Sequence, residues 1–187
     1  CIIGKNGVGK TTLLKKIAKD LMERSDIRAE YMPQNYEDQL DLSLTPVEYL
    51  NTTGDKEEMT RIRTYLGALK YTADEMDHPI RELSGGQKAK VLLLKMSLSN
   101  ANVLILDEPT SALDPIAEYE IYQHFNSLTK GKTTIYISHR LSSARFTNKV
   151  AVISDGNLCE FGSHEELISI ENGLYHEMFK MQAQHYN

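Results

Sequence analysis

The chain has 187 residues, of which 41% are hydrophobic and 25% are charged, which is ordinary for one globular domain with a sizeable core. Its formal net charge of −5 creates no overall basic field, so we expect no direct DNA binding. The two cysteines, Cys1 and Cys159, lack the spacing of a metal site and favour a reducing compartment over a disulfide framework. The longest apolar runs are too short to span a bilayer.

The first part of the chain alternates strands and a helix. Cys1–Ile3 is expected to end a strand, and Arg28–Met32 to form a short one. Lys10–Glu23 is predicted to be a helix, because apolar residues recur along one stripe of it. The stripe comprises Leu13, Leu14, Ile17, Ala18, Leu21 and Met22. A domain rarely begins inside a central strand, so we expect an N-terminally truncated domain.

The region from Asn35 to Leu98 shows helix signals and no convincing strand. Thr45-Pro46-Val47-Glu48 is a capping box with proline at the first helical position. Asp55 is expected to cap a helix that ends near Leu69, and Ser84–Leu98 is predicted to be another helix. We therefore predict an inserted helical subdomain over about residues 35–98.

The last part of the chain returns to alternation. The predicted elements are a continuous apolar strand Val103–Leu106, a helix Pro115–Leu128, a strand Thr133–Ile137, strands Val150–Ile153 and Leu158–Phe161 around an Asp155-Gly156 turn, a helix opened by the capping box Ser163–Glu166, and a helix Leu174–Gln184. This pattern predicts an α/β fold with a mostly parallel sheet flanked by helices. The core would comprise residues 1–34 and 99–187.

The stretch "GKNGVGKT", Gly4 to Thr11, matches the phosphate-loop pattern G-x-x-x-x-G-K-[ST]. It lies between a predicted strand and a predicted helix, as the pattern requires. Glycines let the backbone turn its N–H groups toward phosphate oxygens, and the helix N-terminus favours the negative charge. Lys10 is expected to reach the β- and γ-phosphates, and the Thr11 hydroxyl to coordinate Mg²⁺. The pattern in this context indicates a P-loop NTPase.

Two acids follow the apolar strand Val103–Leu106. Asp107 is expected to emerge at the carboxyl edge of the sheet, where ligands bind in such folds, and to complete the metal site. Glu108 is expected to point elsewhere and to polarise an attacking water. A strand that simply ends in solvent is the structural alternative, and the phosphate loop argues against it.

The stretch "LSGGQ", Leu83 to Gln87, has two interpretations. Ser84 and Gln87 have the spacing of a capping box, which alone would make this a helix start. Two successive glycines weaken a helix start, however, and suit a backbone that a phosphate approaches closely. If this stretch and the phosphate loop are far apart in the subunit, one nucleotide cannot contact both within it. A composite site formed by two subunits would allow both contacts.

Together these motifs resemble the nucleotide-binding domain of ATP-binding cassette (ABC) proteins, over nearly the whole chain. The resemblance implies ATP and Mg²⁺ as ligands and ATP hydrolysis as the reaction. It implies a Walker A loop whose nucleotide contacts are Gly4, Lys5, Asn6, Gly7, Val8, Gly9, Lys10, Thr11 and Thr12. The aromatic residue that stacks on adenine in this family lies upstream of the Walker A strand, and this chain starts after that position.

The resemblance also implies roles for later residues. Gln34 in "YMPQN" would be the Q-loop glutamine, which contacts Mg²⁺ or the attacking water, and His139 in "ISHR" would be the switch histidine. Asp107 would be the Walker B acid and Glu108 the catalytic glutamate. The signature Leu83–Gln87, with Ser84, Gly85, Gly86 and Gln87, would contact the γ-phosphate of the opposite subunit. Ser111–Asp114 would be the D-loop, with Asp114 at the dimer contact.

The two halves resemble different branches of the family. "YMPQNYED" and "YTADEMDHPIRELSGGQKAKVLLLKMSLS" look like the ABC-F subfamily, whose members are soluble, carry paired cassettes in one chain and often act on ribosomes. "EPTSALDP", "ISHRLSSAR" and "GLYHEMFKMQAQHY" look like membrane exporters. Three hypotheses follow: an export ATPase at the cytoplasmic face of the cell membrane, with a second cassette and a transmembrane domain as partners; an ABC-F-type ATPase with the ribosome as partner; or a truncated, weakly active cassette.

Overall fold

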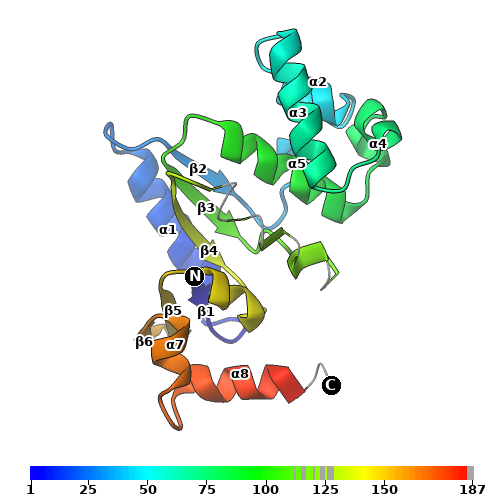
Figure 1. The fold of residues 1–187 in the computed structure, drawn as a ribbon. Coiled ribbons are helices and arrows are strands. Elements are labelled where there is room, and N and C mark those ends of the chain that lie inside the picture. The colour runs from blue at the N-terminus through cyan, green and yellow to red at the C-terminus, as the bar shows by residue number, and fades with distance from the viewer. Residues whose placement is uncertain (112, 115–116, 120, 123–124, 126–128, 185–187) are drawn as a thin grey trace. The chain divides into compact units, whose positions relative to one another are not determined.

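The computed structural model describes residues 1–111, 113–114, 117–119, 121–122, 125 and 129–184 (Figure 1). The chain divides into two compact units. The first comprises Cys1–Gln34, Ala101–Pro109 and Thr129–Asn187, and the second comprises Asn35–Asn100 and Thr110–Leu128. The second unit is therefore assembled from two stretches of sequence, whereas the predicted insert over about residues 35–98 is one stretch.

The first unit is built on a six-stranded sheet with the order β2-β3-β4-β1-β5-β6. The strands are β1 (Ile2–Ile3), β2 (Ala29–Met32), β3 (Val103–Asp107), β4 (Thr133–Ile137), β5 (Val150–Ser154) and β6 (Asn157–Gly162). All neighbours pair in parallel except β5 and β6. The prediction of a mostly parallel α/β sheet is confirmed.

Strand β3 lies between β2 and β4, and its side chains explain why it is an interior strand. Leu104, Ile105 and Leu106 are at most 2% exposed, as expected for a strand covered on both faces. Leu106 pairs with Met32 of β2 and with Tyr136 of β4, so these parallel strands end at the same edge. The segments that follow β1, β2, β3 and β4 therefore leave the sheet together.

Helix α1 (Lys10–Met22) covers one face of the sheet. Leu14 and Ala18 are buried against a cluster that includes Ile2 and Ile105. The apolar stripe is narrower than predicted, because Leu13 is 39% and Met22 is 49% exposed. Neither side chain belongs to the cluster that α1 forms with the sheet.

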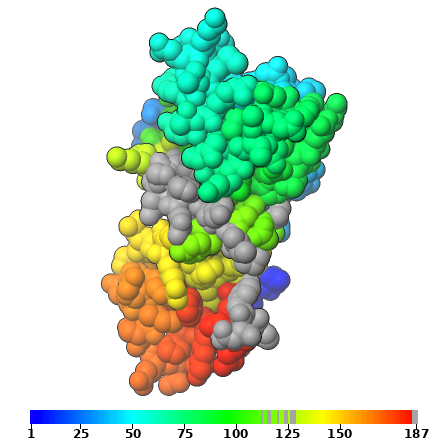
Figure 2. Space-filling model, turned by 45° about the vertical axis from the view of Figure 1, so that its right-hand side comes forward, coloured from blue at the N-terminus to red at the C-terminus, as the bar shows by residue number. Residues whose placement is uncertain are grey.

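The other face is covered by the end of the chain. Ile2 and Ile3 are consecutive in β1 and so point to opposite faces; Ile3 packs with Leu167 and Tyr175. These two residues belong to α7 (His164–Ile168) and α8 (Leu174–Gln184). Helix α8 also contacts the 3₁₀ helix η3 (Leu141–Phe146), and Figure 2 shows α8, in red, beside the yellow segment that holds η3.

The local signals for turns and caps are confirmed in this unit. Asp155 and Gly156 both have positive φ, 49° and 75°, as a two-residue hairpin turn of type I′ requires. Ser163 and Glu166 form the predicted capping box at the start of α7. The predicted helix Lys10–Glu23 has Glu23 as its C-terminal cap residue.

The second unit contains helices and no strand among its described residues. Its helices are α2 (Pro46–Leu50), α3 (Lys56–Ala68), α4 (Ala73–Asp77) and α5 (Gly85–Leu98), with 3₁₀ turns η1 (Glu37–Gln39) and η2 (Ile80–Glu82). Thr45, Asp55 and Ser84 cap α2, α3 and α5 as predicted. Helix α4 was not predicted, although Thr72 and Glu75 form a capping box that marks it. The predicted helix Pro115–Leu128 lies largely outside the described residues.

Among the described residues, none of the helices combines the length and the hydrophobicity that a membrane span requires.

The start of α8 is held by a single carboxylate of β6. Glu160 accepts hydrogen bonds from the N–H groups of Leu174 at 2.6 Å and Tyr175 at 2.9 Å. Glu160→Ala leaves both first-turn donors without this acceptor, so we expect the free energy of unfolding to fall by about 1–2 kcal/mol. Equilibrium urea unfolding measures this. The exposed Glu171→Ala is the control and should change it by less than about 0.5 kcal/mol; equal losses in the two variants would contradict the assignment.

Candidate functional site

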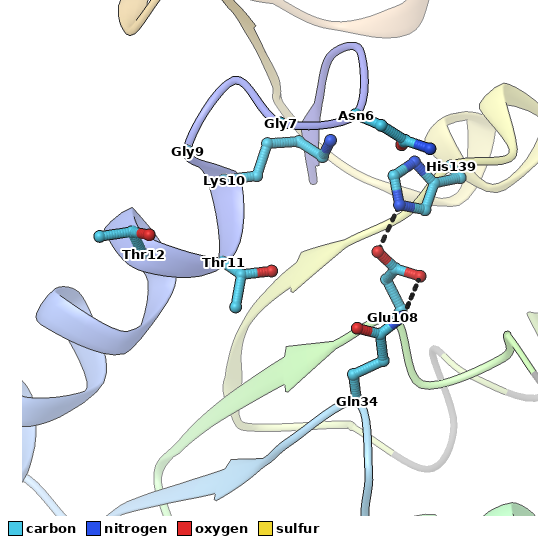
Figure 3. A pocket seen from close by; sticks show the side chains of 9 residues that line it. All are labelled: Asn6, Gly7, Gly9, Lys10, Thr11, Thr12, Gln34, Glu108 and His139. Atoms are coloured by element: carbon cyan, nitrogen blue, oxygen red, sulfur yellow. Dashed lines mark hydrogen bonds and ion pairs between the residues drawn. The ribbon is translucent and has the colours of Figure 1, made fainter.

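A cavity of about 370 Å³ opens at the edge of the sheet where β1, β2, β3 and β4 end. Figure 3 shows its nine lining residues: Asn6, Gly7, Gly9, Lys10, Thr11, Thr12, Gln34, Glu108 and His139. Each was predicted as a site residue. They come from the segments after four different strands, so the topology of the sheet brings them together.

The loop between β1 and α1 depends on glycine. Gly7 and Gly9 have φ of 80° and 91°, which L side chains rarely adopt. Gly4 has a φ of 153°, and a Cβ there would lie 2.2 Å from the carbonyl oxygen of Ile153. The loop can take this path only with glycine at these positions, as the motif predicts.

Helix α1 differs at its N-terminus from five other helices of the chain. Side chains of Thr45, Asp55, Thr72, Ser84 and Ser163 cap α2, α3, α4, α5 and α7. Gly9 holds this position in α1, and no side chain caps the helix. The first N–H groups of a helix have no partner within it, and together with the helix dipole they attract an anion. This end of α1 lies at the cavity, because Gly9, Lys10 and Thr11 line it.

Lys10 brings a buried positive charge to the cavity. It is 5% exposed, and its Nζ donates to the carbonyl oxygens of Gly4 and Lys5, each at 2.9 Å. Burial lowers the pKa of Lys10, and the carboxylates of Glu108 and Asp107 oppose that shift. An ammonium has three donors, so two bonds to the loop leave one for a phosphate oxygen.

Asp107 is joined to the first turn of α1 and to β2. Its Oδ1 accepts from the Thr11 hydroxyl at 3.2 Å and its Oδ2 from the Tyr31 hydroxyl at 3.3 Å. Asp107 is 1% exposed. Burial, then the charge of Asp107 and this hydrogen bond, raise the pKa of Tyr31 to about 12. Tyr31 was not predicted as a site residue, because a tyrosine in a strand carries no motif.

The oxygens of Thr11 and Asp107 suit Mg²⁺. No group of three His, Cys, Asp or Glu side chains that would hold a metal exists in the described part of the chain. Mg²⁺ is usually bound through one or two protein oxygens together with substrate phosphates and water, rather than by a full protein shell. The pair therefore fits a metal that arrives with a nucleotide. Gln34 was predicted as a further ligand; its Nε2 donates to Glu108, and its contact with Mg²⁺ stays a prediction.

Glu108 turns away from Asp107. Its φ of 53° is in the left-handed region, which is uncommon for a residue other than glycine. Its Oε2 accepts from Gln34 Nε2 at 3.1 Å, and its Oε1 pairs with His139 Nε2 (Figure 3). The side chain of Glu108 is 12% exposed and that of His139 is 38% exposed. Two consecutive acids thus have separate partners, as predicted.

Val8, a predicted contact of the first unit, does not line the cavity and packs against the cluster of Leu14 and Ile105. The other remaining predicted residues belong to the second unit. Ser84 accepts from the N–H of Gln87 at 3.3 Å, and the N–H of Ser84 donates to Gln87 Oε1 at 2.9 Å, so both form a capping box. Asp114 accepts from the N–H of Ala117 at 3.0 Å, and residue 112 of the predicted D-loop lies outside the described residues. For Ser84, Gly85, Gly86, Gln87 and Asp114, contact with a nucleotide stays a prediction.

Residues 1–111 match the family model described as ABC transporter. The chain belongs to the ABC transporter family. A nisin transport ATP-binding protein of Lactococcus lactis subsp. lactis is 34% identical over 197 residues, which cover 89% of this chain and 33% of that protein. This ABC domain thus spans a third of the length of that relative.

Solved structures have the same fold. A bacterial Atm1-family ABC exporter with ATP bound matches 97% of this chain and 36% of that chain, with a TM-score of 0.70 and 25% identity. A dimeric ATP-binding cassette in a post-hydrolysis state, bound to ADP and phosphate, matches 87% of this chain and 83% of that chain, with a TM-score of 0.69 and 22% identity. Neither these matches nor the nisin transport protein supports the ABC-F resemblance of the first half, which stays a prediction.

Lys10 provides a direct test of the cavity. Lys10→Met removes the buried ammonium, so we expect ATP binding to weaken by at least about 2 kcal/mol, roughly 30-fold. Titration with a fluorescent ATP analogue measures the affinity. Lys5→Met is the matched control, because the exposed Lys5 contributes its main-chain carbonyl to the site; its affinity should stay within about threefold of the parent. Equal affinities for the Lys10 variant and the parent would contradict the assignment.

Proposed function

We propose that this ABC domain hydrolyses ATP in the cavity at the edge of the sheet, as a head-to-tail dimer, and powers export through a transmembrane partner. The observation that carries the proposal is the meeting of the phosphate loop and Glu108 in one cavity. A phosphate-binding loop alone supports binding. A carboxylate held beside it provides a group that polarises water, which hydrolysis requires.

The loop would hold the phosphates. Its glycines turn main-chain N–H groups toward the anion, and the uncapped end of α1 adds to them. Lys10 would place its ammonium against the γ-phosphate, where negative charge must be stabilised during transfer. When bound, Mg²⁺ supplies further charge neutralisation at the phosphate oxygens, held by Thr11 and Asp107.

Glu108 would accept a hydrogen bond from the attacking water. Gln34 and His139 each engage one of its oxygens, and each carboxylate oxygen keeps a second lone pair for water. These two contacts fix the orientation of the carboxylate before the substrate arrives. Preorganisation of this kind avoids reorganisation during the reaction, and base catalysis is typically worth about 10²–10⁴ in rate.

A dimer would complete the site. Ser84 and Gly85 are exposed at the start of α5, so their hydroxyl and backbone are accessible to a second subunit. A helix N-terminus there suits the phosphate of a nucleotide held by the partner. The matching dimeric cassette with ADP and phosphate supports this arrangement. Asp114 would contribute at the same contact.

Export is the proposed use of the ATP. The nisin transport protein and the Atm1-family exporter, which this domain resembles, support a role in transport. The work would be delivered to a transmembrane domain, on the same or on another chain. In that case the ABC domain would lie at the cytoplasmic face of a membrane.

Glu108→Gln tests the proposed reaction. The carboxamide keeps the size of the side chain and loses the base, so we expect ATP turnover to fall by about 10²–10⁴. ATP binding should persist, so dimers of the variant should accumulate in the presence of ATP. A coupled ATPase assay and size-exclusion chromatography with light scattering, with and without ATP, measure the two properties. Equal turnover in the variant and parent would overturn the catalytic role of Glu108.

The dimer has its own control in the same background. Adding Ser84→Arg to Glu108→Gln blocks the exposed start of α5 and leaves the cavity of the first unit unchanged. We expect this double variant to bind ATP and to remain monomeric. ATP-dependent dimers of the double variant would contradict the role of the signature.

A further inference from the structure

The last helix reaches the segment that carries His139. Gln182 lies in α8, and its Nε2 donates to the carbonyl oxygen of His139 at 2.5 Å. Its Oε1 accepts from the N–H of Leu141 at 2.8 Å. A primary amide has a donor and an acceptor side by side, so it binds a carbonyl and an N–H two residues apart, as a neighbouring strand would. One side chain therefore clamps the backbone on both sides of Arg140.

Other hydrogen bonds lie within this segment, and the N–H of Ser138 donates to the carbonyl oxygen of Ile2 in β1 at 3.3 Å. The Ser138 hydroxyl accepts from the N–H of Arg140 at 3.1 Å, and the Ser143 hydroxyl donates to the Arg140 carbonyl at 2.7 Å. Tyr136 donates to the carbonyl of Ser143 at 2.9 Å. These bonds shape the turn between β4 and η3. The bonds from Gln182 span 43 and 41 residues, so they tie the turn to a separate element.

Helix α8 provides a fixed base for that tie. Its N-terminal turn is bound by Glu160, as described above. Tyr175 is fully buried in the cluster under the sheet. Phe179, one turn further on, packs in the same cluster and lies under the guanidinium of Arg145 at 5.0 Å. A helix anchored at these points holds Gln182 in place at its other end.

We propose that Gln182 is a positioning residue for His139, and that α8 serves as the base that holds Gln182 in place. The inference rests on the proposed function. The His139 imidazole pairs with Glu108, and His139 is 38% exposed by its side chain, so neighbouring side chains confine the ring only in part. Fixing the carbonyl of His139 and the N–H of Leu141 fixes the backbone from which the imidazole projects. Gln182 thus acts on Glu108 through His139 without touching a nucleotide.

Both groups of the amide are needed for this role. Leucine has similar length and removes both hydrogen bonds. Glutamate keeps the acceptor for Leu141 but loses the donor, and it sets a carboxylate against the His139 carbonyl. The expectation is a loss in the chemical step with little loss in nucleotide binding, because neither variant alters the phosphate loop.

The experiment compares Gln182→Leu, Gln182→Glu and Gln184→Leu with the parent in the full chain. Gln184 is the matched control, since it is exposed on the same helix. For both Gln182 variants we expect kcat to fall about tenfold and KM for ATP to stay within about twofold, since small misplacements of a catalytic group are costly. Gln184→Leu should match the parent in both constants. Thermal unfolding of each variant is measured in parallel.

Three outcomes would overturn the proposal. The first is kcat within about twofold of the parent in Gln182→Glu, which keeps the helix polar and is the variant better able to fold. The second is a fall in kcat/KM that comes entirely from a higher KM for ATP, with kcat unchanged. The third is an equal loss in Gln184→Leu. Glu108→Gln is assayed beside them: if it turns over ATP at the parental rate, the proposed function fails, whereas loss in Glu108→Gln with normal Gln182 variants rejects only the positioning role.

Discussion

The site depends on one backbone feature, the left-handed turn at Glu108 that directly follows a buried strand. Asp107 ends β3 at 1% exposure, where a carboxylate is costly unless it is hydrogen-bonded. Thr11 and Tyr31 meet that need. The φ of 53° at Glu108 then directs the next carboxylate to Gln34 and His139. A continuous strand would have pointed the two acids to opposite faces of the sheet.

The rest of the first unit serves this arrangement. Parallel pairing brings the ends of β1, β2, β3 and β4 to one edge, so each contributes a loop to the same cavity. Helix α1 buries Leu14 and Ala18 on the sheet and leaves its uncapped end at that cavity. On the opposite face, α8 is bound by Glu160 and buried through Tyr175, and it reaches the loop of His139. Both layers of helices therefore bear on the site.

The sequence predicts the parts of the site that have local signatures. The phosphate loop, the paired acids and the caps at Thr45, Ser84 and Ser163 were found because their spacing along the chain carries the information. Tyr31 and Gln182 were missed because their partners are 76 and 43 residues away, and only strand register and helix packing reveal such pairs. The exposure of Leu13 and Met22 has the same origin, since periodicity shows that a stripe exists but not how much of it the sheet covers.

The central claim is that Asp107 and Glu108 have separate tasks. The direct measurement is ATP affinity with and without Mg²⁺ for the parent, Asp107→Asn and Glu108→Gln. We predict that Asp107→Asn loses most of the affinity gained with Mg²⁺, because Asp107 and Thr11 supply the oxygens that suit the metal. Glu108→Gln should keep that gain while losing turnover. A similar loss of the Mg²⁺-dependent affinity in both variants would contradict the account.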